Sequence, residues 1–168
     1  MNEMLILRIV HVFCGVFWAG TMIFFATFLE PILRGAGPEG GRMMQRIAAS
    51  RYPLVMMVVA ILTLLSGLRM YQIVSSGTAG WAQSRMGIVL STGAAVAMLA
   101  FAIGLVVNRP SAARMAQLAQ AVQAGGGQPT PEQAAQIALV RARLVGATRV
   151  VATLLALTVI AMAAARYV

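Results

Sequence analysis

The sequence contains no lysine and no aspartate, and it has few charged residues of any kind. Its 168 residues include 13 basic side chains, all arginine, and four acidic ones, all glutamate, so that 10% of the chain is charged and 60% is hydrophobic. Soluble domains carry roughly 25% charged residues on average. A chain with so little charge cannot cover itself with a polar surface, so we expect the lipid bilayer to be its main solvent.

Cysteine and histidine each occur once, as Cys14 and His11. One cysteine excludes an internal disulfide, and a single Cys and His cannot supply the ligands of a structural zinc site. The net charge of +9 does not indicate a nucleic-acid partner, because the arginines stand at the ends of apolar runs and not in one water-facing patch. The few glutamates lie at or beyond these ends, which argues against hydrolases and ATPases that need paired carboxylates.

Four apolar runs are long enough to cross the roughly 30 Å hydrocarbon core of a bilayer, which takes about 20 helical residues. They cover residues 5–29, 54–74, 86–107 and 144–165. Backbone groups in lipid need internal partners, and the runs lack the alternation of barrel strands. We therefore predict an all-α fold, an integral membrane four-helix bundle, and we expect residues 1–168 to form a single membrane domain.

Two of the connections between these runs carry helical patterns of their own. In the first, basic and apolar residues around Arg42 and Ile47 predict a short amphipathic helix on the cytoplasmic face. In the third, we predict a cytoplasmic helical hairpin over about residues 111–143. Its second arm begins at Thr130, because Thr130 and Gln133 form a capping-box pattern.

The distribution of arginine predicts the orientation. The first and third connections hold more arginines than the second connection and the two termini together. By the positive-inside rule, this places both longer connections in the cytoplasm and both termini outside. We therefore expect a multi-pass membrane protein with both termini on the outer side.

His11 lies inside the first run, about two turns from its outer end at roughly 1.5 Å per residue. An ionisable side chain in a membrane is costly and often functional. The imidazole could ligate haem iron or copper, or it could simply donate a hydrogen bond to a neighbouring backbone carbonyl. Gly15 and Trp18 lie one and two turns inward on about the same face, and Gly15 would let a flat macrocycle lie against the backbone.

Four arginines fall at the same outer end of the bundle as His11, where they could bind haem propionates or snorkel to the interface. They are Arg8, Arg69, Arg85 and Arg166. With a single histidine, six-coordinate iron would need a methionine or the His11 of a second chain, so a homodimer is a natural expectation. The candidate methionines at this level are Met70, Met86 and Met162.

Glu30 and Arg149 lie near the inner ends of the first and last runs. An ion pair between them would stabilise the bundle. Glu30 could equally pair with Arg34, four residues further along the same helix. For either pairing we expect a structural role and no part in chemistry.

Two short motifs resemble a group of bacterial membrane proteins. One is His11 followed by the sequence Trp-Ala-Gly at residues 18–20, and the other is residues 63–68 followed by Trp81 and Arg85. Together they are similar to the copper resistance protein D family and to the HemJ-type protoporphyrinogen oxidases, over the first three runs. The resemblance implies a membrane bundle in which the histidine of the first span, here His11, ligates a b-type haem.

In the HemJ-type proteins a lysine stands at the position of Arg85. Because arginine cannot act as a base at ordinary pH, we do not expect protoporphyrinogen oxidation. We expect instead an inner-membrane protein that binds haem b near the outer leaflet through His11, for electron transfer to a redox partner or for haem handling. Two alternatives stay open: a copper-handling protein that uses His11, Cys14 and methionines, and a non-catalytic accessory subunit of a larger membrane complex that docks through its helical hairpin.

Overall fold

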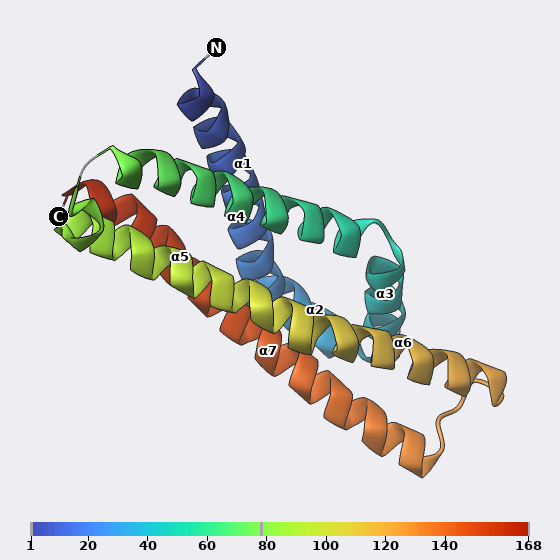
Figure 1. Ribbon diagram of the computed structural model, residues 1–168. Coiled ribbons are helices and arrows are strands. Elements are labelled where there is room, and N and C mark those ends of the chain that lie inside the picture. The colour runs from blue at the N-terminus through green and yellow to red at the C-terminus, as the bar shows by residue number, and fades with distance from the viewer. Residues whose placement is uncertain (1, 78, 168) are drawn as a thin grey trace.

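The computed structural model describes residues 2–77 and 79–167, and every regular element in these two ranges is a helix (Figure 1). The α-helices are α1 (Glu3–Phe24), α2 (Glu30–Gly35), α3 (Gly37–Ala49), α4 (Tyr52–Ser76), α5 (Arg85–Ile103), α6 (Arg109–Ala124) and α7 (Pro131–Ala164). The predicted all-α fold is confirmed.

Four continuous helical segments are long and apolar enough to cross a membrane. They are Glu3–Gly35, Tyr52–Ser76, Arg85–Ala124 and Pro131–Tyr167. Each contains one of the apolar runs found in the sequence, so the protein is a multi-pass membrane protein. The segment that starts at Arg85 has 40 residues, or about 60 Å at 1.5 Å per residue, and therefore extends well beyond a 30 Å hydrocarbon core.

Two of these segments contain a π-helical turn. One, Phe25–Leu29, joins α1 to α2, and the other, Gly104–Asn108, joins α5 to α6. At the end of the first turn the N–H of Glu30 donates to the carbonyl of Phe25, five residues back. The helix passes through the second π turn without a break. The first arm of the hairpin, which we expected to start at about residue 111, is therefore a continuation of α5.

The helices pack as two antiparallel pairs, α1 with α4 and α5 with α7, and α1 also packs against α7 (Figure 1). The buried core lies where these helices cross and is rich in alanine: Trp18, Ala19, Met56, Ala60, Ala100, Val151 and Leu155. Small side chains at helix crossings let backbones approach closely in lipid. The large apolar side chains point outward; Phe13, for example, is 70% exposed to the surroundings that a bilayer would fill.

α6 packs against the first turns of α7 and forms a helical hairpin. The capping box at its second arm is present, since Thr130 Oγ1 accepts from the Gln133 N–H at 3.2 Å and the Thr130 N–H donates to Gln133 Oε1 at 3.0 Å. Leu118 of α6 is buried between the arms. Arg114 links them at the surface through a 3.3 Å hydrogen bond to Gln136.

Candidate functional site at His11

The imidazole of His11 turns toward α4. Its Nδ1 lies 2.8 Å from the backbone carbonyl oxygen of Thr63 and 3.5 Å from the hydroxyl oxygen of Ser66. A carbonyl oxygen can only accept, so Nδ1 must carry the proton and donate it. In the neutral imidazole, this assignment leaves the lone pair on Nε2.

The backbone of α4 comes close to the imidazole because residue 67 is glycine. A Cβ added at Gly67 would lie 2.7 Å from Cε1 and 3.0 Å from Nδ1 of His11. Real Cβ atoms do not approach other heavy atoms at 2.7 Å, so any larger residue would push the ring away from Thr63. The glycine at residue 67 therefore allows the imidazole of His11 to pack directly against the backbone of α4.

The geometry at His11 fits a metal-ligating histidine. Such residues commonly donate one ring N–H to a backbone carbonyl, which orients the ring and leaves the other nitrogen as the ligand. No hydrogen-bond partner reaches His11 Nε2 within residues 2–77 and 79–167. The carbonyl bond anticipated for a purely structural histidine is thus present, and it engages only one of the two ring nitrogens.

Gly15 and Trp18 have roles in packing. A Cβ at Gly15 would meet the side-chain methyl of Thr63 at 3.5 Å, so the space beside Gly15 is already filled by α4. This differs from our expectation that a macrocycle would lie there, because single-helix spacing does not reveal what the neighbouring helix contributes. Trp18 is 5% exposed and meets Phe101 edge to face, with ring centroids 6.3 Å apart.

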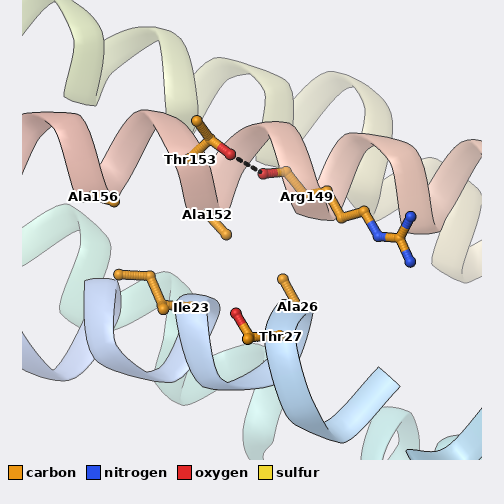
Figure 2. Close-up of a pocket in the computed structure, with 7 residues that line it drawn as sticks. All are labelled: Ile23, Ala26, Thr27, Arg149, Ala152, Thr153 and Ala156. Carbon is orange, nitrogen blue, oxygen red and sulfur yellow. Dashed lines mark hydrogen bonds between the residues drawn. The ribbon is translucent and has the colours of Figure 1, made fainter. Parts of the chain in front are cut away.

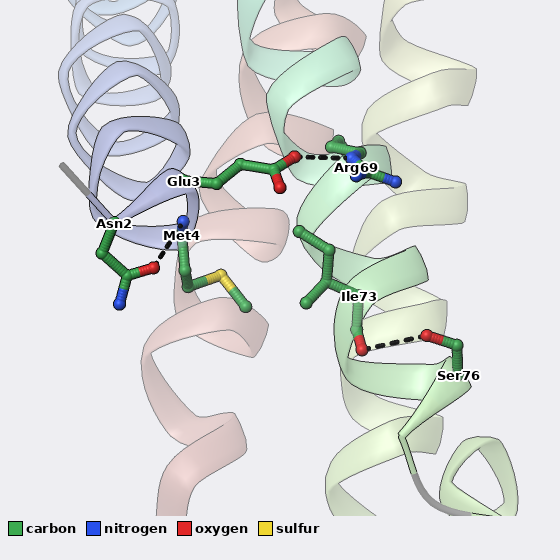
Figure 3. Close-up of polar contacts among 6 residues, drawn as sticks. All are labelled: Asn2, Glu3, Met4, Arg69, Ile73 and Ser76. Atoms are coloured by element: carbon green, nitrogen blue, oxygen red, sulfur yellow. Dashed lines mark hydrogen bonds and ion pairs between the residues drawn. The ribbon is translucent and has the colours of Figure 1, made fainter.

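The four arginines expected to lie near the level of His11 are in different environments. Arg69 Nε donates to Glu3 Oε1 at 2.8 Å, an ion pair that crosses from α4 to α1 (Figure 3). The guanidinium of Arg166 lies 5.3 Å from the ring centroid of Tyr167. Arg8 and Arg85 are exposed and make no ion pair within the part of the chain that the structure describes. Of the four, only Arg8 and Arg69 lie on the helix that contains His11, α1, or on the helix that it contacts, α4.

The candidate methionines do not form a group. The terminal methyl of Met162 would lie 3.1 Å from a Cβ at Gly93, which places this side chain in the α5–α7 interface. Met70 is half-buried on α4, and Met86 is exposed in the first turn of α5. Among the described residues, no group of three or more His, Cys, Asp or Glu side chains could hold a metal ion.

Glu30 forms the most buried charged site, at the opposite end of the bundle. Its side chain is 6% exposed, with Oε2 3.4 Å from Arg149 Nη2 and Oε1 3.9 Å from Arg34 Nε. Both pairings considered from the sequence therefore occur together. Two buried oxygens, Glu30 Oε1 and Asn108 Oδ1, have no hydrogen-bond partner in the described ranges. Each lies at the end of a π-helical turn. Neither feature was predicted from the sequence.

An open cavity of about 380 Å³ lies between the end of α1 and α7, next to Arg149 (Figure 2). Its walls are mostly small side chains, among them Ala26 and Ala152. The hydroxyl of Thr153 donates to the carbonyl of Arg149 at 3.0 Å, and the guanidinium extends along α7 away from these alanines (Figure 2). The hydroxyls of Thr27 and Thr153 are the polar side-chain groups of the cavity besides Arg149.

Comparisons with protein-family models, with curated proteins and with solved structures find no match to this chain. The resemblance to the copper resistance protein D and HemJ-type proteins therefore stays a prediction, carried by the motifs around His11 and Trp81.

Proposed function

We propose that this membrane protein binds a b-type haem through Nε2 of His11 and serves in electron transfer or haem handling. The observation that carries the proposal is the hydrogen bond from His11 Nδ1 to the carbonyl of Thr63. It orients the ring and leaves Nε2 as the nitrogen that would ligate the iron. A bound haem would supply one-electron chemistry, which the amino-acid side chains of this chain cannot.

Arg8 is the arginine best suited to hold a propionate. It lies one helical turn from His11 on α1, is exposed, and has no ion-pair partner in the described ranges. Arg69 lies at the same end of the bundle, but Glu3 already neutralises it at 2.8 Å. Arg8 could bind a propionate without losing an existing ion pair, so it would contribute more than Arg69.

His11 would be the residue that this chain supplies to hold the iron. Met162 is engaged at Gly93 in another interface. The imidazole of His11 turns toward α4, away from this interface, so Met162 is not placed to share a ligand with His11.

We place α3 and the α6–α7 hairpin in the cytoplasm and both termini outside a bacterial inner membrane. The support is the excess of arginine on α3 and the hairpin. This orientation puts His11, in the N-terminal half of α1, toward the outer leaflet.

Haem titration of the purified protein tests the proposal. Full-length protein in mild detergent is titrated with haemin beside His11→Ala, and beside Gly20→Ala as a control at a helical position with no atom within 4 Å of the added Cβ. We expect saturable binding of one haem in the wild type and in Gly20→Ala. We expect its loss in His11→Ala, and its return on addition of free imidazole. Equal binding by His11→Ala would overturn the assignment.

The helical hairpin favours a second candidate, an accessory subunit of a larger membrane complex. Leu139 is 72% exposed on the part of α7 that extends beyond the predicted span, with Arg141 and Arg143 beside it. The hairpin formed by α6 and the first turns of α7 extends beyond the predicted spans, so it would offer a partner subunit a surface outside the bilayer. Co-purification from native membranes tests it: loss of a partner with Leu139→Asp, but not with His11→Ala, would support this function in place of haem binding.

A further inference from the structure

α3 lies at the boundary of the membrane because of the helices on either side of it. The segment Glu3–Gly35 ends two residues before α3, and α4 begins three residues after it. α4 has 25 residues, or about 37 Å, which is little more than the hydrocarbon thickness of roughly 30 Å. The start of α4, and α3 with it, must therefore lie near the lipid headgroups. Figure 1 shows α3 running crosswise to α4, as a helix in the membrane plane would.

Close contacts hold α3 in this position. Gly40 packs against the backbone of Leu33, where a Cβ would overlap the carbonyl group. At the other end, Ser50 Oγ donates to the Ile47 carbonyl at 2.7 Å and accepts from the Tyr52 N–H at 3.1 Å. α3 is thus fixed to both neighbouring helices and does not hang as a loose loop.

The exposed side of α3 is mostly basic, and its one acidic residue, Glu39, lies in the first turn. Arg42 and Arg46 are exposed one turn apart, and Arg51 is exposed just after the helix. None of the three makes an ion pair within residues 2–77 and 79–167, whereas the nearby Arg34 is engaged by Glu30. Next to them Met43 is 47% exposed. Arginines beside an exposed apolar residue are typical of a helix that lies in the headgroup layer.

We propose that α3 binds anionic phospholipids, with Arg42, Arg46 and Arg51 on the headgroup phosphates and Met43 among the acyl chains. The position of α3 between two spanning helices favours lipid over a soluble phosphate compound, since lipid phosphates surround this layer on every side. Each basic residue near an anionic surface strengthens binding about fivefold. The three together should therefore favour an anionic lipid by about 100-fold over a zwitterionic one.

Lipid binding by the intact protein tests this proposal. The full chain is delipidated in mild detergent, and native mass spectrometry follows retention of dioleoylphosphatidylglycerol and of dioleoylphosphatidylcholine. The test variant carries Arg42→Gln, Arg46→Gln and Arg51→Gln. The control variant loses the same charge on the hairpin, through Arg114→Gln, Arg141→Gln and Arg143→Gln.

We expect the wild type and the hairpin variant to prefer phosphatidylglycerol, and the α3 variant to lose most of this roughly 100-fold preference. Because all three substituted side chains on α3 are exposed, helix content measured by circular dichroism should stay unchanged. An equal loss in both variants would mean that net charge alone governs binding and would overturn the proposal. No preference for phosphatidylglycerol in the wild type would overturn it as well.

Discussion

The ring of His11 occupies the space that a side chain at Gly67 would need, with Cε1 2.7 Å from the position of the missing Cβ. This contact, together with the Nδ1 bond to Thr63, sets the direction in which Nε2 points. The site therefore depends on one glycine of α4 as much as on the histidine of α1.

Gly67→Ala should displace His11 and destabilise the protein by about 1–3 kcal/mol, since an added methyl group in a packed interface forces its neighbours to shift. Thermal unfolding in detergent measures the change. In the double variant Gly67→Ala with His11→Ala the clash is absent, so most of the loss should be recovered. Gly20→Ala serves as the control, because no atom lies within 4 Å of its Cβ. If the losses of stability from Gly67→Ala and His11→Ala simply added, this would contradict a direct contact between His11 and residue 67.

Arg8 and Arg69 should differ in their effect on haem. Arg8→Gln removes a guanidinium with no carboxylate partner in the described ranges, so haem should dissociate faster and the reduction potential should fall. Arg69→Gln removes a cation that Glu3 already neutralises, so its effect should be small. Haem transfer to apomyoglobin and a redox titration measure both quantities. A larger effect from Arg69→Gln would refute the assignment of Arg8.

Removal of Arg149 should cost more stability than removal of Arg34. Arg149 is the nearer partner of Glu30, at 3.4 Å against 3.9 Å, and the carboxylate is only 6% exposed. A buried carboxylate that loses its closer partner costs about 1–3 kcal/mol, whereas a long, exposed pair contributes below about 1 kcal/mol. Thermal unfolding of Arg149→Gln and Arg34→Gln compares the two. Equal effects would show that the two arginines share the charge evenly.

Thr130→Ala should loosen the hairpin without changing the membrane helices. The substitution removes the hydroxyl that caps Gln133, which costs about 1 kcal/mol. Hydrogen exchange should therefore speed up in the first turn of α7. Exchange near His11 should stay unchanged, and a change there would contradict the separation between the hairpin and the outer half of the bundle.

The fold could be predicted well from the sequence, because apolar runs of about 20 residues leave few alternatives in lipid. The capping box at Thr130 and the pairing of Glu30 were also predictable, since both follow from local spacing. The two π-helical turns were not, because no residue type signals a shift of hydrogen bonding from four residues to five.

The site was predicted only in part. Spacing on one helix placed Gly15 and Trp18 on the face of His11, but it could not show which helix that face would meet. The roles of Gly67 and Thr63 arise from the contact between α1 and α4, far apart in the sequence. Similarly, the ion pair of Arg69 with Glu3 depends on how the two helices cross, so an arginine expected to be free is already paired.

The most direct test of the account is an absorption spectrum of the protein, oxidised and then reduced with dithionite, after purification in mild detergent from haem-replete cells. The account predicts a Soret band that shifts on reduction in the wild type and is absent from His11→Ala of unchanged helix content. A wild-type protein with no Soret band, or a band that persists in His11→Ala, would contradict haem ligation by His11.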